Sequence, residues 1–516
     1  MHLVHPSAIS KIDKYAERAL GIPTRTLMER AGRAVERAVR EYVKKGAVVS
    51  IFAGKGNNGG DGYAAALYLA DDYRVTVYEV FSGRQRSDDG RYFLNAFAAR
   101  GGRIEPLLLD EKQLENITAS DAIVDAVFGT GFFGDLPEIA VKLSEIFASL
   151  EHAVKIAVDV PLGIDAAYGR VLEGVRYRAT ATVVLGYIKC GLVSYPAMEY
   201  VGKLIYDNIG LQDEDITPCF TFTDHYVDRD LARELVPQRA QNSHKGAFGK
   251  LMAIVGSSAF PGAAHLSLEA ALRSGVGYVS YLGEKALCDS LILKWPEAIY
   301  KPFSIADLTS DEIDSVVKLS ANQTAILCGS GSTRSGGLLD LLMRLLSEDG
   351  APLVLDADAI NSLGSNPEIG MSLIRSSPRT VILTPHPMEA ARLAEIPIDY
   401  IQNDRLKFAK DFASYNKCIL VLKGAATIVT DGEETYINSS GSSALAKAGS
   451  GDVLAGHLAA LVAMGMDPLR ASALAVYLHG HAADILSDEL SEFGVTPSDL
   501  PREIARCISR LVKEKE

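Results

Sequence analysis

A chain of 516 residues is too long for one ordinary compact domain, so we expect two or three domains. Apolar residues make up 48% and charged residues 23% of the sequence, which is typical of a soluble globular protein. The 65 acidic residues outnumber the 52 basic ones, and a net charge of −13 argues against a nucleic-acid scaffold. No apolar run reaches the roughly 18 residues of a membrane span. We therefore expect a cytoplasmic protein with no nucleic-acid or membrane partner.

Short apolar runs alternate with amphipathic stretches in the first half of the chain. Residues Ser7–Val43 have helical periodicity that breaks at Gly21, Ile22 and Pro23. Strands are predicted at Val48–Ala53, Val75–Phe81, Ala122–Val127, Lys155–Val160, Ala181–Leu185 and Lys203–Tyr206, with helices at Asp61–Ala70 and Asp89–Arg100. This alternation predicts a parallel sheet with helices on both faces.

The acidic stretch Leu211–Pro218 is the best linker candidate, because the alternation starts again after it. Strands are predicted at Lys250–Val255, Ala325–Cys328, Leu353–Leu355, Val381–Thr384, Ile419–Leu422 and Thr427–Thr430, with a helix at Gly262–Ser274. The sequence therefore predicts two α/β domains that are not copies of each other.

A glycine-rich loop follows the first predicted strand and opens a helix. It has five glycines in the nine residues Gly54–Gly62, which allow close backbone approach to a ligand. The N–H groups at the start of the helix favour phosphate. Asn57, Asn58 and Asp61 add side-chain oxygens, so the loop indicates a ligand or cation site rather than a purely structural turn.

Two acids stand at the ends of neighbouring strands. Asp125 is followed by Gly129 and Gly131, and Asp159 opens the segment Asp159–Asp165. A single acid in such a place is more often a turn former or helix cap. Ligands of open α/β sheets bind beyond the carboxyl ends of the strands, so two acids beside a glycine loop favour a site.

These segments, GKGNNGGDGY, DAVFGTG and DVPLGID, resemble the N-terminal domain of the NAD(P)HX epimerase family over residues 1–212. The resemblance implies a Rossmann-like, three-layer α/β/α fold and a potassium ion near Asn58 and Asp125. It also implies Asp125 as the acid/base that epimerises the hydrated C6 centre. The implied substrate-binding residues are Asn57, Asn58, Gly59, Gly60, Asp61, Gly62, Gly129, Thr130, Gly131, Phe132, Phe133, Gly134, Asp135, Asp159 and Lys189.

Two positions depart from that family pattern. Leu162 stands where the family usually has serine, and Arg30 where it usually has asparagine. Leucine supplies no side-chain ligand for a hard cation, so we expect potassium binding to be weaker or to use main-chain oxygens. An alternative follows, in which the N-terminal domain is a binding or scaffold module without catalysis.

The segment Ala448–Gly456, AGSGDVLAG, places glycines immediately before a helix and a carboxylate, Asp452, in its first turn. Main-chain N–H groups there form an anion hole. Such donors neutralise a migrating phosphoryl group while the carboxylate takes the proton from an attacking hydroxyl. The plainer interpretation is an acid near a helix start beside flexible glycines.

Further strand ends carry polar residues: Cys328–Ser332, Asp356 with Asp358, His386 with Glu389, and Lys423–Thr427. With SHKGAFG at 243–249 and the segments at 261–264 and 270–275, these resemble the ribokinase-like superfamily. More narrowly, they resemble the ADP-dependent NAD(P)HX dehydratases, from about residue 228 to 516, which leaves residues 213–227 as the linker.

This resemblance implies that a nucleotide phosphorylates the C6 hydroxyl of the hydrate, with Asp452 as base, and that phosphate then leaves. The implied contacts to the hydrated cofactor are Ala263, Gly331, His386 and Asp452. The implied contacts to ADP are Lys423, Gly424, Ala425, Ala426, Thr427, Ser443, Ala444, Leu445, Ala446, Lys447, Ala448, Gly449, Ser450 and Gly451. Mg²⁺ is expected with the phosphates, and ATP is the alternative nucleotide.

The predicted function is repair of hydrated nicotinamide cofactors. The first domain would interconvert the R and S hydrates of NADH and NADPH, and the second would dehydrate the S form, converting ADP to AMP and phosphate. We expect a homo-oligomer that binds NADHX, NADPHX and ADP. The alternative is a small-molecule kinase of the hydroxymethylpyrimidine type with a non-catalytic N-terminal domain. The GxGD motif does not separate the two, but the SHKG and TPHPxE segments favour the dehydratase.

Overall fold

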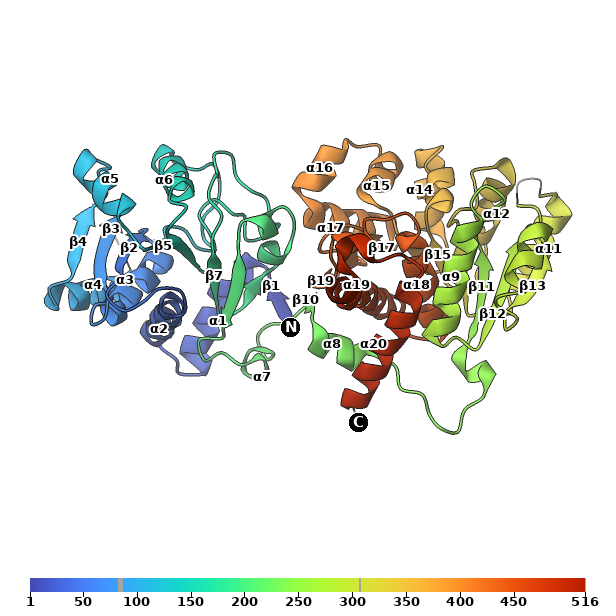
Figure 1. Cartoon of the computed structure of the whole chain (residues 1–516), viewed down its shortest axis with the longest axis horizontal. Helices are drawn as coiled ribbons and strands as arrows, with labels where there is room; N and C mark the ends of the chain where they lie inside the picture. The colour runs from blue at the N-terminus through green and yellow to red at the C-terminus, as the bar shows by residue number, and fades with distance from the viewer. Residues whose placement is uncertain (82–86, 306–307, 516) are drawn as a thin grey trace. The chain divides into compact units, whose positions relative to one another are not determined.

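The computed structural model describes residues 1–81, 87–305 and 308–515, and divides into two compact units. The N-terminal unit is His2–Asp224, and the C-terminal unit is His225–Glu516 with Met1 (Figure 1). The acidic stretch expected to be the linker belongs to the N-terminal unit, because Leu211 and Ile216 are buried in its core. Among the described residues, no helix is both long and apolar enough to cross a membrane.

The N-terminal unit is built on seven parallel strands in the order β4-β3-β2-β5-β6-β7-β9. Their bounds are β2 Val48–Ala53, β3 Arg74–Glu79, β4 Arg103–Pro106, β5 Ala122–Ala126, β6 Val154–Val158, β7 Ala181–Leu185 and β9 Lys203–Asp207. A short strand, β1 (His2–Val4), pairs in parallel with β8 (Ile188–Lys189). The chain leaves β2 toward β3 on one side and returns to β5 on the other, so the sheet has a switch point there.

Helices cover both faces of this sheet, as predicted. They are α1 Pro6–Ala19, α2 Thr24–Tyr42, α3 Asn57–Leu69, α4 Asp88–Ala99, α5 Glu111–Thr118, α6 Glu138–Ser149 and α7 Asp213–Ile216, with 3₁₀ turns at Cys190–Val193 and Ala197–Glu199. One apolar core lies between the sheet and α1–α4, and a second lies between the sheet and α5–α6. The predicted three-layer α/β/α architecture is confirmed.

The C-terminal unit has strands in the order β13-β12-β11-β14-β15-β16-β17-β18-β19. Their bounds are β11 Lys250–Ile254, β12 Tyr278–Gly283, β13 Ile299–Pro302, β14 Ala325–Cys328, β15 Leu353–Leu355, β16 Val381–Leu383, β17 Ile419–Leu422, β18 Ile428–Thr430 and β19 Thr435–Asn438. Pairing is parallel from β13 to β17 and antiparallel from β17 to β19. Strand β10 (Asp224–Val227) spans the boundary between the units.

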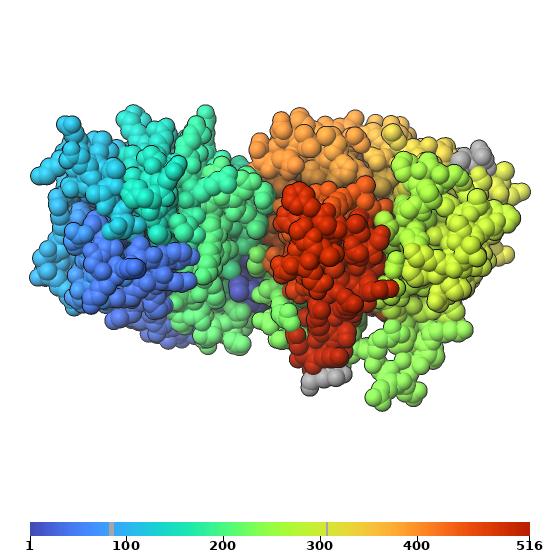
Figure 2. Space-filling model, viewed as in Figure 1, coloured from blue at the N-terminus to red at the C-terminus, as the bar shows by residue number. Residues whose placement is uncertain are grey.

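The helices of this unit are α8 Arg229–Leu235, α9 Pro261–Ser274, α10 Lys285–Leu291, α11 Ser310–Ser320, α12 Gly336–Ser347, α13 Asp358–Leu363, α14 Pro367–Ser376, α15 Pro387–Ala394, α16 Ile398–Asn403, α17 Arg405–Asn416, α18 Ser450–Ala463, α19 Pro468–Gly494 and α20 Leu500–Lys515, with 3₁₀ turns at Lys245–Phe248 and Ser443–Leu445. Helix α18 packs directly on α9, since a Cβ at Gly456 would lie 2.2 Å from the Ser267 carbonyl oxygen. The C-terminal segment, dark red in Figure 2, forms part of the surface of this unit.

Most of the predicted strands are found within one or two residues of their expected bounds. Strands β1, β4, β8, β10, β12, β13 and β19 were not predicted. Of these, β4 and β13 are short, partly exposed strands at sheet edges without a clear apolar pattern. Helix α3 begins at Asn57, four residues before its predicted start, because the segment Asn57–Gly60 is itself helical. Tertiary packing overrides the weak helix propensity of those glycines.

Candidate functional sites

A cavity of about 680 Å³ opens at the carboxyl ends of β2, β5 and β6 in the N-terminal unit. This is the switch point of the sheet, where open α/β folds bind their ligands. The loops after the three strands and helix α1 supply much of its lining, which includes Asp13, Lys55, Gly56, Asn57, Asn58, Asp61, Phe128, Gly129, Thr130, Gly131, Phe132, Asp159 and Lys189. The two predicted strand-end motifs and the glycine loop therefore meet at one site.

Some residues of the glycine loop line the cavity, and others allow close packing of the backbone. Gly56 precedes α3, whose N-terminal residues Asn57 and Asn58 line the cavity. Gly59 and Gly62 serve packing, since a Cβ at Gly59 would lie 2.0 Å from the Gly54 carbonyl oxygen and one at Gly62 would lie 2.8 Å from the Ala126 Cβ. The predicted substrate contacts at Gly59, Gly60 and Gly62 are not among the described residues that line the cavity.

The Asn58 side chain fits a cation ligand. Its Nδ2 donates to the Phe128 carbonyl at 2.6 Å, while its buried Oδ1 has no hydrogen-bond partner among the described residues. A buried amide oxygen without a donor is costly unless a cation, water or ligand meets it. Leu162 does not fit, because its fully buried side chain packs in the apolar cluster with Phe147.

Asp125, the predicted acid/base, lies outside the described lining of the cavity. Its side chain is fully buried. One carboxylate oxygen accepts from the Val127 amide at 3.2 Å, and the other accepts from the Leu162 amide at 2.7 Å and from the Tyr177 hydroxyl. Burial raises the pKa of Asp125 to about 6 although these three donors lower it. Three internal donors hold the Asp125 carboxylate in place, and its role as the acid/base stays a prediction.

The loop after β5 reaches the cavity only with its first half. Phe128 and Phe132 stack with ring centroids 4.0 Å apart and line the cavity with Gly129, Thr130 and Gly131. Phe133 is 75% exposed, and the Gly134 and Asp135 that follow it are exposed as well. Those three predicted contacts therefore lie outside the described lining.

Charged side chains gather at the inner end of the cavity. The buried Lys189 ammonium donates to the Asp159 carboxylate and, at 2.9 Å, to the Leu185 carbonyl. Asp13 and Asp61 line the same cavity. Burial raises the pKa of Asp13 to about 6 and that of Asp61 well above its usual range, and the charge of Asp159 adds to both effects. Asp13 was missed by sequence reasoning, because it lies in an amphipathic helix without any motif.

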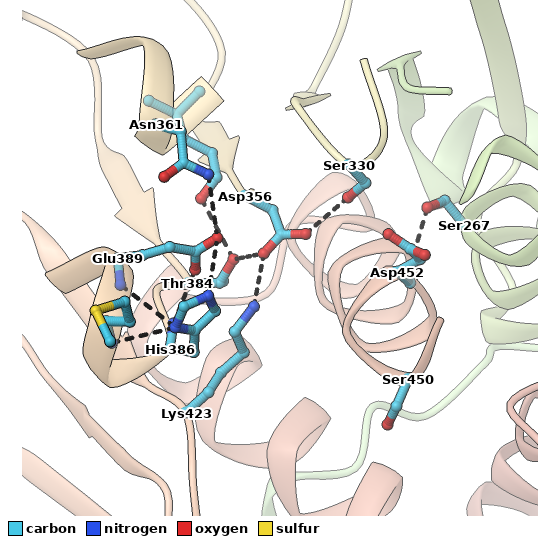
Figure 3. Close-up of polar contacts among 12 residues, drawn as sticks. Ser267, Ser330, Asp356, Asn361, Thr384, His386, Glu389, Lys423, Ser450 and Asp452 are labelled. Atoms are coloured by element: carbon cyan, nitrogen blue, oxygen red, sulfur yellow. Dashed lines mark hydrogen bonds and ion pairs between the residues drawn. The ribbon is translucent and has the colours of Figure 1, made fainter. Parts of the chain in front are cut away.

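In the C-terminal unit a network of polar side chains crosses the carboxyl ends of neighbouring strands (Figure 3). The buried Asp356 carboxylate accepts from Lys423 at 2.9 Å, from the Ser330 hydroxyl at 2.8 Å and from the Thr384 hydroxyl at 2.7 Å. Burial alone would lower the pKa of Lys423, but the charge of Asp356 raises it overall. Asp356 was noted as a strand-end acid but not as a site residue.

Asp452 stands in the first turn of α18, facing this network. Ser267 on α9 fixes its backbone by donating to the Asp452 carbonyl at 3.1 Å. The pKa of the Asp452 carboxyl is raised to about 7. Burial is the largest cause, the charge of Asp356 adds to it, and the charge of Lys423 opposes it. A carboxylate with a pKa near neutrality is suited to general-base catalysis.

The backbone before Asp452 has the form of an anion hole. Gly449 adopts a φ of +100°, which glycine tolerates. The Ser450 amide donates to the Lys447 carbonyl at 3.2 Å, while the Gly451 and Asp452 amides of the first turn of α18 have no acceptor among the described residues. A Cβ at Gly451 would lie 3.5 Å from the Lys423 ammonium, so backbone and cation face one space. His479 on α19 lies 3.1 Å from the Ser450 carbonyl and 3.2 Å from its hydroxyl.

Besides Asp452, three residues were predicted to contact the hydrated cofactor. Ala263 and Gly331 lie against each other, and His386 caps a helix. A Cβ at Gly331 would lie 2.5 Å from the Ala263 Cβ. His386 caps α15, its Nδ1 accepting from the Met388 and Glu389 amides at 3.2 and 3.3 Å. Its side chain is 48% exposed, and its Nε2 lies 3.5 Å from Glu389 Oε1.

The two segments predicted to bind the nucleotide, Lys423–Thr427 and Ser443–Gly451, make different kinds of contact within the unit. Thr427 closes the turn after β17 by donating to the Gly424 carbonyl at 2.8 Å. Lys447 instead donates to the Phe493 carbonyl at 2.7 Å and to the Val495 carbonyl, at the end of α19. Ser443 donates to Glu492 in the same region. These two side chains therefore hold the loop to α19, and only its backbone is left to meet a nucleotide.

The chain matches known proteins in both units. Residues 251–506 match the family model described as NAD(P)H-hydrate dehydratase, and residues 24–191 match that of the YjeF-related protein N-terminus. The chain is 33% identical to the bifunctional NAD(P)H-hydrate repair enzyme Nnr of Moorella thermoacetica, over 100% of this chain and 98% of the relative. It is 30% identical to the protein of that name from Escherichia coli, over 98% of this chain and 94% of the relative. A solved ribokinase-like superfamily protein from Enterococcus faecalis has a TM-score of 0.50 and 25% identity, covering 57% of this chain and 98% of that one.

Proposed function

Because the chain belongs to the family of bifunctional NAD(P)H-hydrate repair enzymes, we propose that each unit performs one step of cofactor repair. The N-terminal unit interconverts the R and S hydrates of NADH and NADPH. The C-terminal unit dehydrates the S hydrate and converts ADP to AMP and phosphate. The relatives that match the full chain carry the name of this repair enzyme, which favours dehydration over a vitamin kinase.

The observation that carries the dehydratase assignment is the position of Asp452 between an anion hole and a buried cation. The terminal phosphoryl group of the nucleotide passes to the C6 hydroxyl oxygen, and Asp452 accepts the hydroxyl proton. The N–H groups at the start of α18 and Lys423 hold the migrating charge. Phosphate then leaves C6 with loss of a proton from C5, which restores the ring double bond. Phosphate is a far better leaving group than hydroxide, so the nucleotide is consumed.

We propose that Ala263, Gly331 and the exposed edge of His386 contact the hydrate, and that Lys423–Thr427 and the backbone of 443–451 contact ADP, with ATP as the alternative. Mg²⁺ would accompany the nucleotide phosphates and neutralise their charge. Asp356 is already hydrogen-bonded to three side chains and fits a role as a fixed charge better than that of a direct ligand.

In the N-terminal unit we propose that Asn57, Asn58, Asp61, residues 129–132, Asp159 and Lys189 hold the hydrate. The buried Asn58 Oδ1 supports a K⁺ contact at that atom, with main-chain oxygens in place of a serine at position 162. The charge of Asp125 would attract the ion although its oxygens are largely occupied. Bound K⁺ would supply positive charge beside the phosphates of the hydrate. On the family resemblance we also propose a cytoplasmic homo-oligomer.

The test supplies the full chain with a mixture of R and S NADHX, ADP and Mg²⁺. We expect the near-ultraviolet absorbance of the reduced nicotinamide ring to return for the whole of the hydrate. Rapid recovery of only half would reject the epimerase. No recovery, together with phosphorylation of a vitamin alcohol, would favour the kinase alternative.

A further inference from the structure

The inner end of the N-terminal cavity holds more negative charge than it can neutralise. Asp13 from α1, Asp61 from α3 and Asp159 after β6 all line the cavity, and the charge of Lys189, which lines it too, acts on both Asp13 and Asp61. Lys189 is hydrogen-bonded to Asp159. Asp13 and Asp61 form no hydrogen bond or ion pair with any other described residue. Neighbouring carboxylates raise one another's pKa, which favours a proton on one of them.

The chemistry of epimerisation needs such a pair. The hydrate carries a hydroxyl on a carbon next to the ring nitrogen. Inverting this centre requires an acid that protonates the departing oxygen and a base that takes a proton from the incoming water. Asp125 is poorly placed for either role, because it is fully buried beneath the cavity and its oxygens accept three internal hydrogen bonds.

We propose that Asp13 and Asp61 are the base and the acid of the epimerase reaction, with Asp159 kept ionised by Lys189. Asp61 gives its proton to the C6 hydroxyl, the C–O bond breaks, water leaves, and the ring nitrogen lone pair forms a C=N bond. Water then adds to the other face of C6 and releases a proton to Asp13. The turnover leaves Asp61 ionised and Asp13 protonated, and proton exchange with solvent water restores the starting state before the next turnover. This assignment rests on the proposed epimerase function of the unit.

The protonation states agree with the surroundings of the two groups. Burial raises the pKa of Asp61 well above its usual range, and both Asp159 and Asp13 raise it further. Burial raises the pKa of Asp13 to about 6, and Lys189 moderates that rise. Asp13 is thus ionised above about pH 6, and the raised pKa of Asp61 favours its protonated form. The other charged residues lining the cavity are Lys14, Glu17, Lys55 and Asp89.

The experiment uses the full chain with R-enriched NADHX and no nucleotide, and follows the R-to-S ratio by chromatography after subtracting the uncatalysed rate. Asp13→Asn and Asp61→Asn should each slow epimerisation by about 10²-fold or more. Dehydration of S-NADHX with ADP should stay within about twofold of wild type. The matched control is Glu115→Gln, which removes an exposed carboxylate on α5, outside the described lining of the cavity, and should keep the epimerase rate.

The pH profile separates catalysis from damage to the fold. Wild-type epimerisation should rise with pH through about 6, because Asp13 must lose its proton. The Asp13→Glu variant should be slower but still show this rise of the epimerisation rate with pH, and the Asp13→Asn variant should not show the rise. Epimerisation by both asparagine variants within about threefold of wild type would overturn the assignment. A wild-type chain that dehydrates but never epimerises would instead remove the proposed function of the unit.

Discussion

The candidate sites of the two units lie at the same edge of their sheets, but the carboxylate of the sequence motif has different surroundings in each unit. Each site lies at the carboxyl edge of a parallel sheet, where a glycine-containing segment leads into a helix. In the C-terminal unit the acid of the motif, Asp452, faces a network with a cation. In the N-terminal unit the acid of the motif, Asp125, is enclosed below the cavity.

The difference comes from the element that carries each acid. Asp125 belongs to strand β5, where the main-chain amides of the next loops and the Tyr177 hydroxyl reach its oxygens. Asp452 lies in the first turn of a helix, beyond the edge of the sheet. The carboxylate of Asp125, within a strand, is therefore hydrogen-bonded by neighbouring groups of the protein, whereas that of Asp452, at the start of a helix, can meet a ligand. A motif acid therefore needs its surroundings before a role is assigned.

The largest expected effect is that of Asp452→Asn. Loss of the base should lower kcat for dehydration by about 10²- to 10⁴-fold, while ADP binding stays within a few-fold. Steady-state kinetics with S-NADHX and calorimetric titration of ADP measure the two effects. Turnover retained near the wild-type level would show that Asp452 is not the base.

Asp125→Asn is the same substitution at the other motif acid, and we expect the opposite outcome. One of the three donors would face an amide N–H, so the N-terminal unit should lose about 1–3 kcal/mol of stability. Its epimerase rate per folded molecule should fall far less than that of Asp13→Asn. Urea unfolding followed by fluorescence, with epimerisation assays below the transition, checks this. A loss of 10²-fold without destabilisation would return the acid/base role to Asp125.

Lys423→Met should change the pH dependence of dehydration. In the wild type kcat should rise with pH through about 7, as Asp452 loses its proton. Lys423 lowers the pKa of Asp452, so its removal should move this limb to higher pH. At pH 7 and saturating ADP, the rate should fall on the order of tenfold for every whole pH unit that the limb moves. A limb that stays in place would separate Lys423 from the ionisation state of Asp452.

Gly456→Ala tests the close packing that holds the helix of Asp452. The added Cβ would meet the Ser267 carbonyl, so stability of the C-terminal unit should fall by about 1–3 kcal/mol. Gly336→Ala, at the start of α12 with open space around it, is the matched control and should be near neutral. Thermal unfolding of both variants measures the difference. Equal melting temperatures would refute the close approach of α9 and α18.

Lys447→Met should have the smallest effect. Because its ammonium binds the carbonyls at the end of α19, we expect a loss of about 1 kcal/mol in stability and little change in the KM for ADP. Thermal unfolding and steady-state kinetics with varied ADP measure the two quantities. A tenfold rise in the KM for ADP would place the side chain at the nucleotide instead.

Local sequence patterns were sufficient to predict the two α/β units, most of their strands and the sheet edges at which the two candidate sites lie. Strand periodicity and glycine spacing are local properties, and the carboxyl ends of parallel strands meet at one edge. The sequence therefore identified Asn58, Asp159, Lys423 and Asp452 as residues of two sites.

Which side chains are open to a ligand depends on contacts between distant parts of the folded chain. Residues far away in the chain bury Asp125, accept the hydrogen bonds of the Lys447 ammonium and form the cavity that Asp13 lines. The same is true of the boundary after Asp224, since the acidic stretch before it is anchored by Leu211 and Ile216 in the core. Burial, hydrogen-bond partners and the pKa values that follow from them are properties of the packed chain, and no local pattern encodes them.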